Sequence, residues 1–155
     1  MKKLFLTMLV VLVSMSAMAQ DKKFGVGFDL LYGTKIKNIG FGVKGQYYAT
    51  EAIRVEADAV FYPKKDDVRL FDACLVGHYL IPVAENMKVY PIVGAGLINW
   101  VDSIDDYTDS SFTVHLGGGY QFDIAEDFAL SAEAKYEIVK DHGQVVFALG
   151  AVYKF

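Results

Sequence analysis

Charged residues occur at every second position in two parts of this sequence. In the segments 54–58 and 133–137, each charged residue is followed by an apolar one. Because residues i and i+2 of a β-strand point to the same face, each segment places both signs of charge on one face. Such a face could line an ion-selective pore, or its charges could pair and fill the inside of a small barrel. With single charges from other segments, the set is Asp29, Lys44, Arg54, Glu56, Asp58, Asp72, Glu133, Lys135 and Glu137.

Internal pairing is the interpretation that we favour for these charges. The interior of an eight-stranded barrel is about filled by side chains, and charges removed from water must pair or become neutral. Arg54 and Lys135 are the expected central cations. Their expected partners are Glu56, Asp58 and Glu133. The predicted lumen charge network is therefore a salt-bridged plug.

Other polar residues offer weaker candidate sites. His78 and His115 fall on the same predicted face as the charges, but no third ligand or nucleophile has the spacing of a zinc or catalytic site. Ser131 and His115 could share a face on adjacent strands, without a recognisable activating group. The aspartates of 102–109 do not follow the EF-hand order, so a solvated acidic loop is expected at 101–110. We predict no catalytic residue, no metal ligand and no cofactor.

Strands must position these residues, because apolar residues alternate with polar or small ones over most of the chain. The alternating segments are about ten residues long, near the length that a tilted strand needs to cross a bilayer. Pro91 interrupts one of them and should lie near a rim or a bulge, since proline cannot donate to the ladder. The eight segments are 23–32, 38–48, 53–62, 69–81, 88–100, 111–122, 128–138 and 144–155.

The last segment favours a membrane barrel over a soluble one. Every second residue from Val145 to Phe155 is apolar, whereas the ends of soluble chains are usually frayed. A membrane barrel needs such a final strand, because pairing it with the first strand removes both sheet edges. Aromatic residues also lie near segment ends, as interfacial girdles require. These are Phe24, Tyr32, Tyr47, Phe61, Tyr79, Phe122, Phe128, Tyr136 and Tyr153.

The start of the chain and its composition agree with export. Residues 1–19 have a basic start, an apolar core and a small-x-small site ending at Ala19, which predicts a cleaved signal peptide. Residues 20–155 then form one domain. Cys74 is the only cysteine, so no internal disulfide is expected. The net charge is −4 and no basic cluster is present, so we expect no binding to nucleic acid.

Three motifs carry a resemblance to a known family: the glycine-alternating start at 24–28, the YPIVGAG stretch at 90–96 and the ending at 150–155. With them the sequence resembles the small eight-stranded outer-membrane β-barrels, such as OmpX and the OmpA transmembrane domain. The resemblance implies an all-β, antiparallel up-and-down transmembrane β-barrel. It also implies a monomer in the bacterial outer membrane, in contact with lipid and lipopolysaccharide. Tyr153 and Phe155 match the terminal signal that the barrel-assembly machinery reads.

The expected function is a structural or surface-interaction role for a non-enzymatic barrel with a closed lumen. One alternative is a narrow porin-like channel for ions or small solutes. A second alternative is an enzyme that modifies lipid A, as some small outer-membrane barrels do.

Overall fold

The computed structural model describes residues 23–65, 68–102, 108–140 and 142–155, and all of its regular elements there are β-strands. The predicted signal peptide at 1–19 lies outside the described residues. In the described part of the chain, no helix is long and apolar enough to span a bilayer. The strands are β1 (Phe24–Gly33), β2 (Asn38–Tyr48), β3 (Ile53–Lys65), β4 (Val68–Tyr79), β5 (Ile81–Ala84), β6 (Met87–Asp102), β7 (Thr108–Asp123), β8 (Phe128–Val139) and β9 (His142–Lys154).

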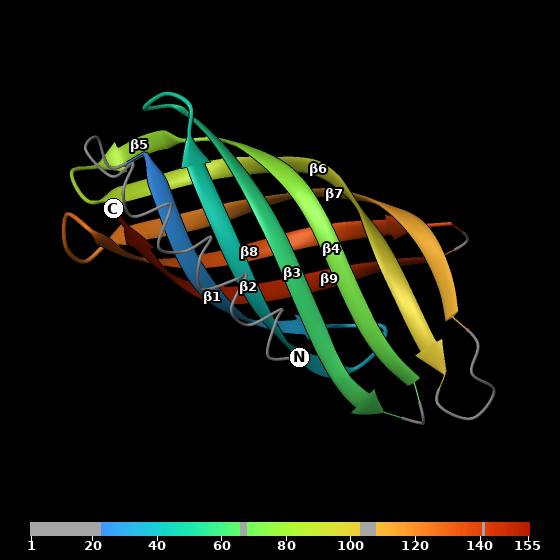
Figure 1. The fold of residues 1–155 in the computed structure, drawn as a ribbon. Helices are drawn as coiled ribbons and strands as arrows, with labels where there is room; N and C mark the ends of the chain where they lie inside the picture. Colours follow the sequence, from blue (N-terminus) through green and yellow to red (C-terminus); the bar gives the residue numbers. More distant parts are fainter. Residues whose placement is uncertain (1–22, 66–67, 103–107, 141) are drawn as a thin grey trace.

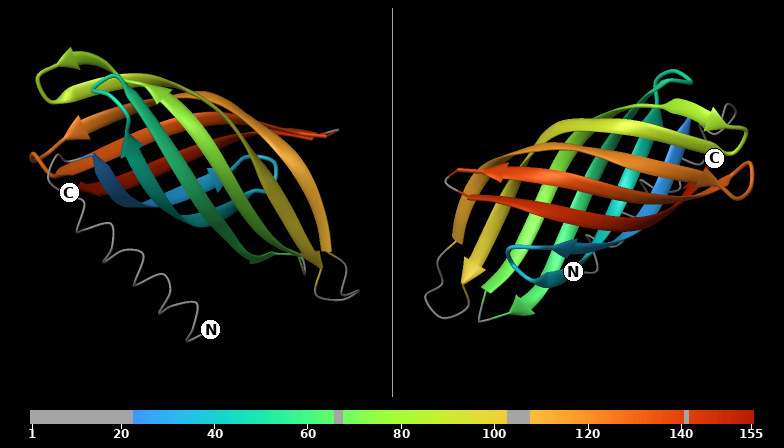
Figure 2. Two further views of the ribbon diagram at one scale, coloured as in Figure 1. Left: turned by 45° about the horizontal axis from the view of Figure 1, so that its top comes forward. Right: turned by 180° about the vertical axis from the view of Figure 1, so that it is seen from behind.

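The strands form one closed sheet. Chain neighbours pair antiparallel, β1 pairs with β9, and both β4 and β5 pair with β6. Because β5 continues the course of β4 after a break at Leu80, the described strands make an eight-stranded up-and-down barrel. The strands wrap obliquely around a common axis, and the C-terminus lies at the same end as β5 (Figures 1 and 2). The predicted fold class is confirmed.

The closing seam depends on the last strand, as its sequence predicted. Residues Gly25 to Gly33 of β1 pair in register with Lys154 to Val146 of β9. The pairing extends past β9, because the Phe155 backbone N–H donates to the Phe24 carbonyl at 2.9 Å. The sheet therefore keeps no free edge along either terminal strand.

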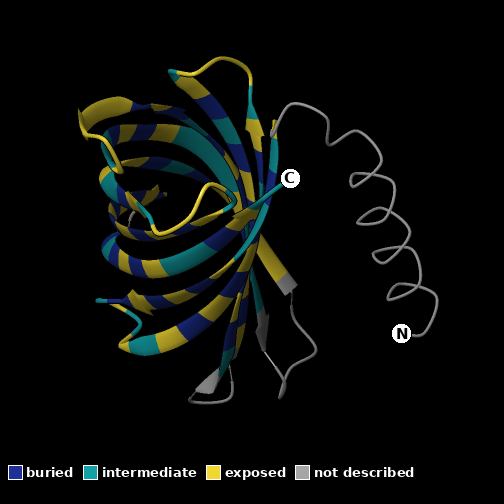
Figure 3. Ribbon diagram, turned by 90° about the vertical axis from the view of Figure 1, so that its left-hand side faces the viewer, coloured by how far each residue is buried: buried dark blue, intermediate teal, exposed yellow. Residues whose placement is uncertain are grey.

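Burial alternates along most of the barrel strands (Figure 3). In β8, the even-numbered positions from Phe128 to Ile138 are exposed and the odd-numbered ones are buried. Large apolar side chains face outward, and Leu149 and Phe112 keep 64% and 62% of their surface accessible. Charged side chains face inward, and Arg54 and Glu56 are fully buried. A surface this apolar is stable only in contact with lipid, so the arrangement is that of a membrane barrel.

Three connections differ from the sequence prediction. The described residues of the expected loop at 101–110 are strand, since β6 runs to Asp102 and β7 begins at Thr108. Residues 103–107 lie outside the described part. The expected turn at 82–87 contains β5, and β3 extends to Lys65 through an irregular register. Each pair of strands continues there because the backbone N–H and C=O groups of one strand bond to those of its hairpin partner, which does not require apolar side chains.

Pro91 lies inside β6, opposite Gly118 of β7. The ladder between β4 and β6 ends at the pair His78–Ile92, and the ladder with β5 begins at Ile81–Val89. Pro91 thus sits at the break between two ladders, where a missing donor costs least.

Candidate functional site

All nine residues of the predicted network are buried and lie on the inner face of the barrel. They come from five strands, β1 to β4 and β8, because each occupies the inward position of its alternation. The two residues of the predicted assembly signal lie at the seam instead, where Tyr153 is exposed and its ring centre is 6.3 Å from that of Phe155.

Lys44 is the centre of one group of contacts. Its Nζ lies 2.9 Å from Asp29 Oδ1 and donates to Ser131 Oγ at 3.3 Å. Carboxylate oxygens of Glu56 and Glu133 lie 3.8 Å and 3.7 Å from the same nitrogen. One cation therefore faces three carboxylates, all buried.

A glycine makes this group possible. Gly150 of β9 stands in register between Asp29 of β1 and Ser131 of β8. A Cβ at Gly150 would overlap the Asp29 carboxylate and would lie 2.8 Å from Ser131 Oγ and 3.0 Å from Lys44 Nζ. We call this place the Gly150 gap, because the missing side chain lets strands that are not neighbours touch inside the barrel.

Lys135 forms the second group. Its Nζ donates to Asp58 Oδ2 at 3.3 Å and lies 3.5 Å from Glu133 Oε2. Glu133 thus lies between Lys44 and Lys135 and links the two groups. These contacts bring Lys135 to two of its expected partners.

Arg54 has different partners from those expected. Its guanidinium donates to His78 Nδ1 at 3.0 Å through Nε and to Gln121 Oε1 at 2.5 Å through Nη1. The guanidinium carbon also lies 4.6 Å from the centre of the Tyr90 ring. Among the described residues no carboxylate forms an ion pair with Arg54. Its hydrogen bonds go to neutral acceptors, and the face of a ring, which attracts cations, lies beside it.

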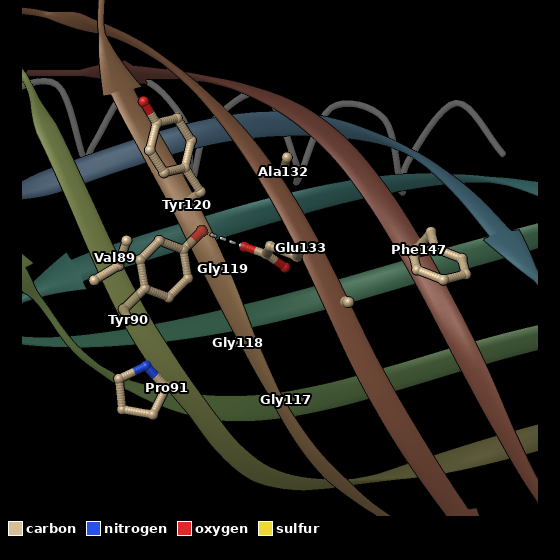
Figure 4. A pocket seen from close by; sticks show the side chains of 11 residues that line it. Val89, Tyr90, Pro91, Gly117, Gly118, Gly119, Tyr120, Ala132, Glu133 and Phe147 are labelled. Carbon is tan, nitrogen blue, oxygen red and sulfur yellow. Dashed lines mark hydrogen bonds between the residues drawn. The ribbon is translucent and has the colours of Figure 1, made fainter.

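Tyr90 connects this arginine group with the lysine groups. Its hydroxyl donates to Glu133 Oε1 at 2.7 Å, and the two side chains point toward each other in Figure 4. The ring fills the space above Gly119, where a Cβ would overlap it. Gly119, in the glycine run 117–119, is therefore a position of tight packing. Toward the outside, the same run borders a hollow of roughly 670 Å³ (Figure 4).

The neutral members of the network were not predicted from the sequence. Gln46 Nε2 donates to Glu56 Oε2 at 2.5 Å, and Gln144 Nε2 donates to Glu137 Oε2 at 2.6 Å. Both glutamines are inward positions of their strands, so the alternation itself was the available signal.

Acidic groups outnumber basic ones inside the described barrel. The buried charged side chains are six carboxylates and three cations. Several carboxylate oxygens have no hydrogen-bond partner, which is costly in a buried site. They include one oxygen each of Glu56, Asp58, Asp72 and Glu137.

The polar residues considered for catalysis are not brought together. Ser131 contacts Lys44, while His115 Nε2 lies 2.9 Å from Thr113 Oγ1. In the β7–β8 register, His115 is opposite Glu137 and Ser131 is opposite Gln121, six positions away. The two residues do share a barrel interior, but the geometry is not that of a nucleophile and its base.

Apolar layers lie on either side of the charged region. At the end opposite the termini, a buried cluster packs with Ile36 and Trp100. Toward the termini, a second cluster packs with Tyr48. Hollows of roughly 540 Å³ and 660 Å³ lie at the two ends, bordered by Ile98 and Val139 in one case and by Leu80 in the other.

Comparison with known families supports the architecture. The sequence profile of the outer membrane protein beta-barrel domain matches residues 5–155. The chain belongs to this family. A search of the curated proteins finds no match.

Solved structures of other members of this architecture superpose on the chain. Neisserial surface protein A (NspA) has a TM-score of 0.72 at 15% identity, over 86% of this chain and 97% of that one. The N-terminal barrel domain of Pseudomonas aeruginosa OprF has a TM-score of 0.68 at 17% identity, over 85% and 96%. The outer membrane enzyme PagL has a TM-score of 0.54 at 11% identity, over 84% and 99%. At these identities the likeness is one of fold, and the proteins that share this fold include an enzyme.

Proposed function

We propose that this family member is a non-enzymatic outer-membrane barrel with a closed lumen and a structural or surface-interaction role. The observation that carries the proposal is the filling of the lumen. Ion-paired side chains occupy its middle, and an apolar cluster without charged members crosses it at the end opposite the termini. That cluster consists of Leu31, Val60, Tyr62, Leu70, Ile98, Val139, Val146 and Ala148.

The outer surface supports a membrane location for the chain. Exposed aromatic residues lie toward both ends of the strands, with Tyr47, Tyr79 and Tyr153 near the termini and Tyr32 and Phe61 near the opposite end. Two such belts fit the two interfaces of a bilayer. In our proposal the protein is exported by the signal peptide, and the termini face the periplasm. It is monomeric, it touches lipid and lipopolysaccharide, and the assembly machinery reads its last strand.

The surface role follows from a closed lumen, since function must then lie outside it. The hollow at the end opposite the termini is bordered by Lys35, Trp100, Asp109 and Lys140. Charged and aromatic side chains together suit contact with another envelope component.

Two measurements test the proposal. Outer membranes are extracted, and the protein should migrate faster before boiling than after it; removal of Phe155 should abolish this shift. The purified barrel in planar bilayers should then show no single-channel current. A protein that is soluble, or one that conducts steadily, contradicts the proposal.

A narrow channel is the second candidate, and the excess of buried carboxylates favours it, since such a lumen would select cations. The apolar cluster is then the barrier to test. If Ile98→Ala combined with Leu31→Ala opens a cation current that the original protein lacks, the cluster is the seal. If the original protein already conducts, the channel replaces the closed barrel as the better description.

We propose no catalytic role for the polar interior. The Ser131 hydroxyl is engaged by Lys44 and stands six register positions from the level of His115. Mass spectra of lipid A from cells with and without the protein should be identical, and a mass change that depends on Ser131 would show an enzyme instead.

A further inference from the structure

We propose that Asp72, Cys74 and His115 form a binding site for a divalent transition metal ion of the zinc type inside the barrel. One donor atom from each of the three side chains lies within 4.8 Å of the other two. All three residues are buried, with 7%, 7% and 3% of their surface accessible.

The barrel brings these residues together across an intervening strand. Asp72 and Cys74 belong to β4 and His115 belongs to β7, while β6 lies between them. Gly96 of β6 is in register with Cys74, and Gly94 is in register with His115. Any larger inward side chain at these two positions of β6 would stand between the three donors.

The two glycines are required by their surroundings. A Cβ at Gly96 would lie 2.6 Å from Cys74 Cβ, and one at Gly94 would lie 2.5 Å from Val76 Cγ1. We call this place the Gly94–Gly96 gap. It allows donors from β4 and β7 to approach over a bare stretch of β6.

An unsatisfied carboxylate points to a missing cation in this gap. Asp72 has no ion pair among the described residues, and its buried Oδ1 has no hydrogen-bond partner. Lys135 is a basic group whose charge acts on Asp72, but its Nζ is bound to Asp58 and Glu133. A buried carboxylate that lacks a partner is costly, and a metal ion would neutralise it.

The donor set selects the metal class. One sulfur, one imidazole nitrogen and one carboxylate oxygen suit zinc, whereas magnesium and calcium prefer oxygen ligands alone. A tetrahedral zinc ion holds its ligand atoms about 3.3–3.8 Å apart, so small side-chain rotations would close the present spacing. A solvent molecule or the neighbouring Asp58 would take the fourth position.

Metal binding requires that Cys74 lose its proton. In the structure the Cys74 thiol donates to Asp58 Oδ2 at 3.5 Å. On binding, the sulfur–hydrogen bond breaks, its electron pair goes to the metal, and the proton passes to Asp58 and then to water. Thr113, whose Oγ1 is 2.9 Å from His115 Nε2, orients the imidazole ring.

A second cluster consists of Glu56, His78 and Glu133 and has similar spacing, but it is not suited to bind a metal ion. His78 Nδ1 accepts from the Arg54 guanidinium, so Nε2 carries the ring proton and offers no lone pair. Lys44 and Lys135 also lie within 4 Å of carboxylate oxygens in that cluster and supply its positive charge. His78 therefore serves as a matched control for His115.

The test uses Co²⁺ as the probe. The full-length protein is isolated, unfolded, refolded into detergent micelles with Co²⁺, and freed of unbound metal; gel migration before boiling verifies folding. The original chain should retain one Co²⁺, with the intense near-ultraviolet band of a thiolate–cobalt bond and the visible bands of tetrahedral cobalt. Cys74→Ser should lose the thiolate band. His115→Gln should lower affinity beyond the about 10–100-fold typical of losing an outer-shell partner.

The His78→Gln control should keep both the metal and the thiolate band. The proposal is overturned if the folded original chain retains no cobalt, or if the cobalt that it retains shows no thiolate band. It is also overturned if His115→Gln and His78→Gln bind cobalt equally. Should Cys74→Ser fail to fold, the two histidine variants still decide the question.

Discussion

The Gly150 gap and the Gly94–Gly96 gap are both made by inward-facing glycines, but they differ in the charges that they contain. In each, glycine on an inward position lets side chains from non-adjacent strands meet inside the barrel. The Gly150 gap contains a cation, because Lys44 reaches both Asp29 and Ser131. The Gly94–Gly96 gap brings Asp72 close to a thiol and an imidazole, and its carboxylate has no ion pair with any described residue.

This difference separates what glycine does from what charge does. Glycine provides the space, but only a counter-ion makes a buried carboxylate stable. Where the chain supplies the counter-ion itself, the buried carboxylates need no other cation. Where it does not, an ion from outside completes the region in our proposal. Substitutions that remove or add charge should therefore act in opposite directions in the two gaps.

The largest effect is expected from removal of the cation in the Gly150 gap. Lys44→Ala leaves three buried carboxylates facing one another and should lower the free energy of unfolding by about 3–5 kcal/mol. Urea titration of the barrel in lipid vesicles measures this change. A loss below 1 kcal/mol would mean that solvent already screens the group.

Neutralising one carboxylate in each gap compares the two directly. Asp29→Asn removes a partner of Lys44 and should cost about 1.5–3 kcal/mol of stability. Asp72→Asn removes an unpaired buried charge and should raise the stability of the metal-free barrel by about 1 kcal/mol. The same urea titration in the presence of a chelator measures both, and equal signs for the two variants would contradict the comparison.

Filling the Gly150 gap tests the role of space alone. Gly150→Ala places a methyl group against the Asp29 carboxylate and Lys44 Nζ, so overpacking should cost about 1–3 kcal/mol. Gly45→Ala is the matched control, because a Cβ there meets no atom within 4 Å. Similar losses for both variants would show a general glycine effect instead of a gap.

The smallest effect is expected at the rim near the termini. Lys88 Nζ lies 3.0 Å from Asp123 Oδ2, and Lys154 Nζ lies 2.8 Å from Asp123 Oδ1. The Lys88 side chain is 28% accessible, so Lys88→Ala should cost at most about 1 kcal/mol, and less in high salt. A loss of stability comparable to that of Lys44→Ala would mean that burial does not determine how much an ion pair of this barrel contributes to stability.

Alternation predicted most of the fold, because a period of two decides that a strand forms and which residues share a face. The apolar final strand and the aromatic residues near segment ends then indicated which face points inward. Arg54, Lys135 and the other charged residues of the predicted network are buried in the structure, on the face that the alternation assigned to them. Alternation could not name the partner of Arg54, since contacts across the lumen depend on the stagger of strands that are distant in sequence. His78 and Gln121 reach Arg54 from β4 and β7, and nothing in their spacing indicates this.

The glycine gaps were beyond prediction for a similar reason. Gly94, Gly96 and Gly150 are visible in the sequence, but their value depends on which side chains flank them in neighbouring strands. Strand ends were also predicted poorly. The stretch 101–110 is polar and rich in aspartate, as loops are, yet β6 and β7 pair as far as Val101 and Thr108.

The hydrogen bonds between Phe24 and Phe155 make the chain a nearly complete ring with a single cut. Because Phe24 and Phe155 already lie side by side, a short linker could join β1 to β9. The chain could then begin and end at another hairpin on the same side of the barrel. Such a rearranged chain would keep every ladder while losing its terminal aromatic residue. The shape of the barrel and the insertion signal that we propose for its last strand would then be separable properties, although one strand carries both.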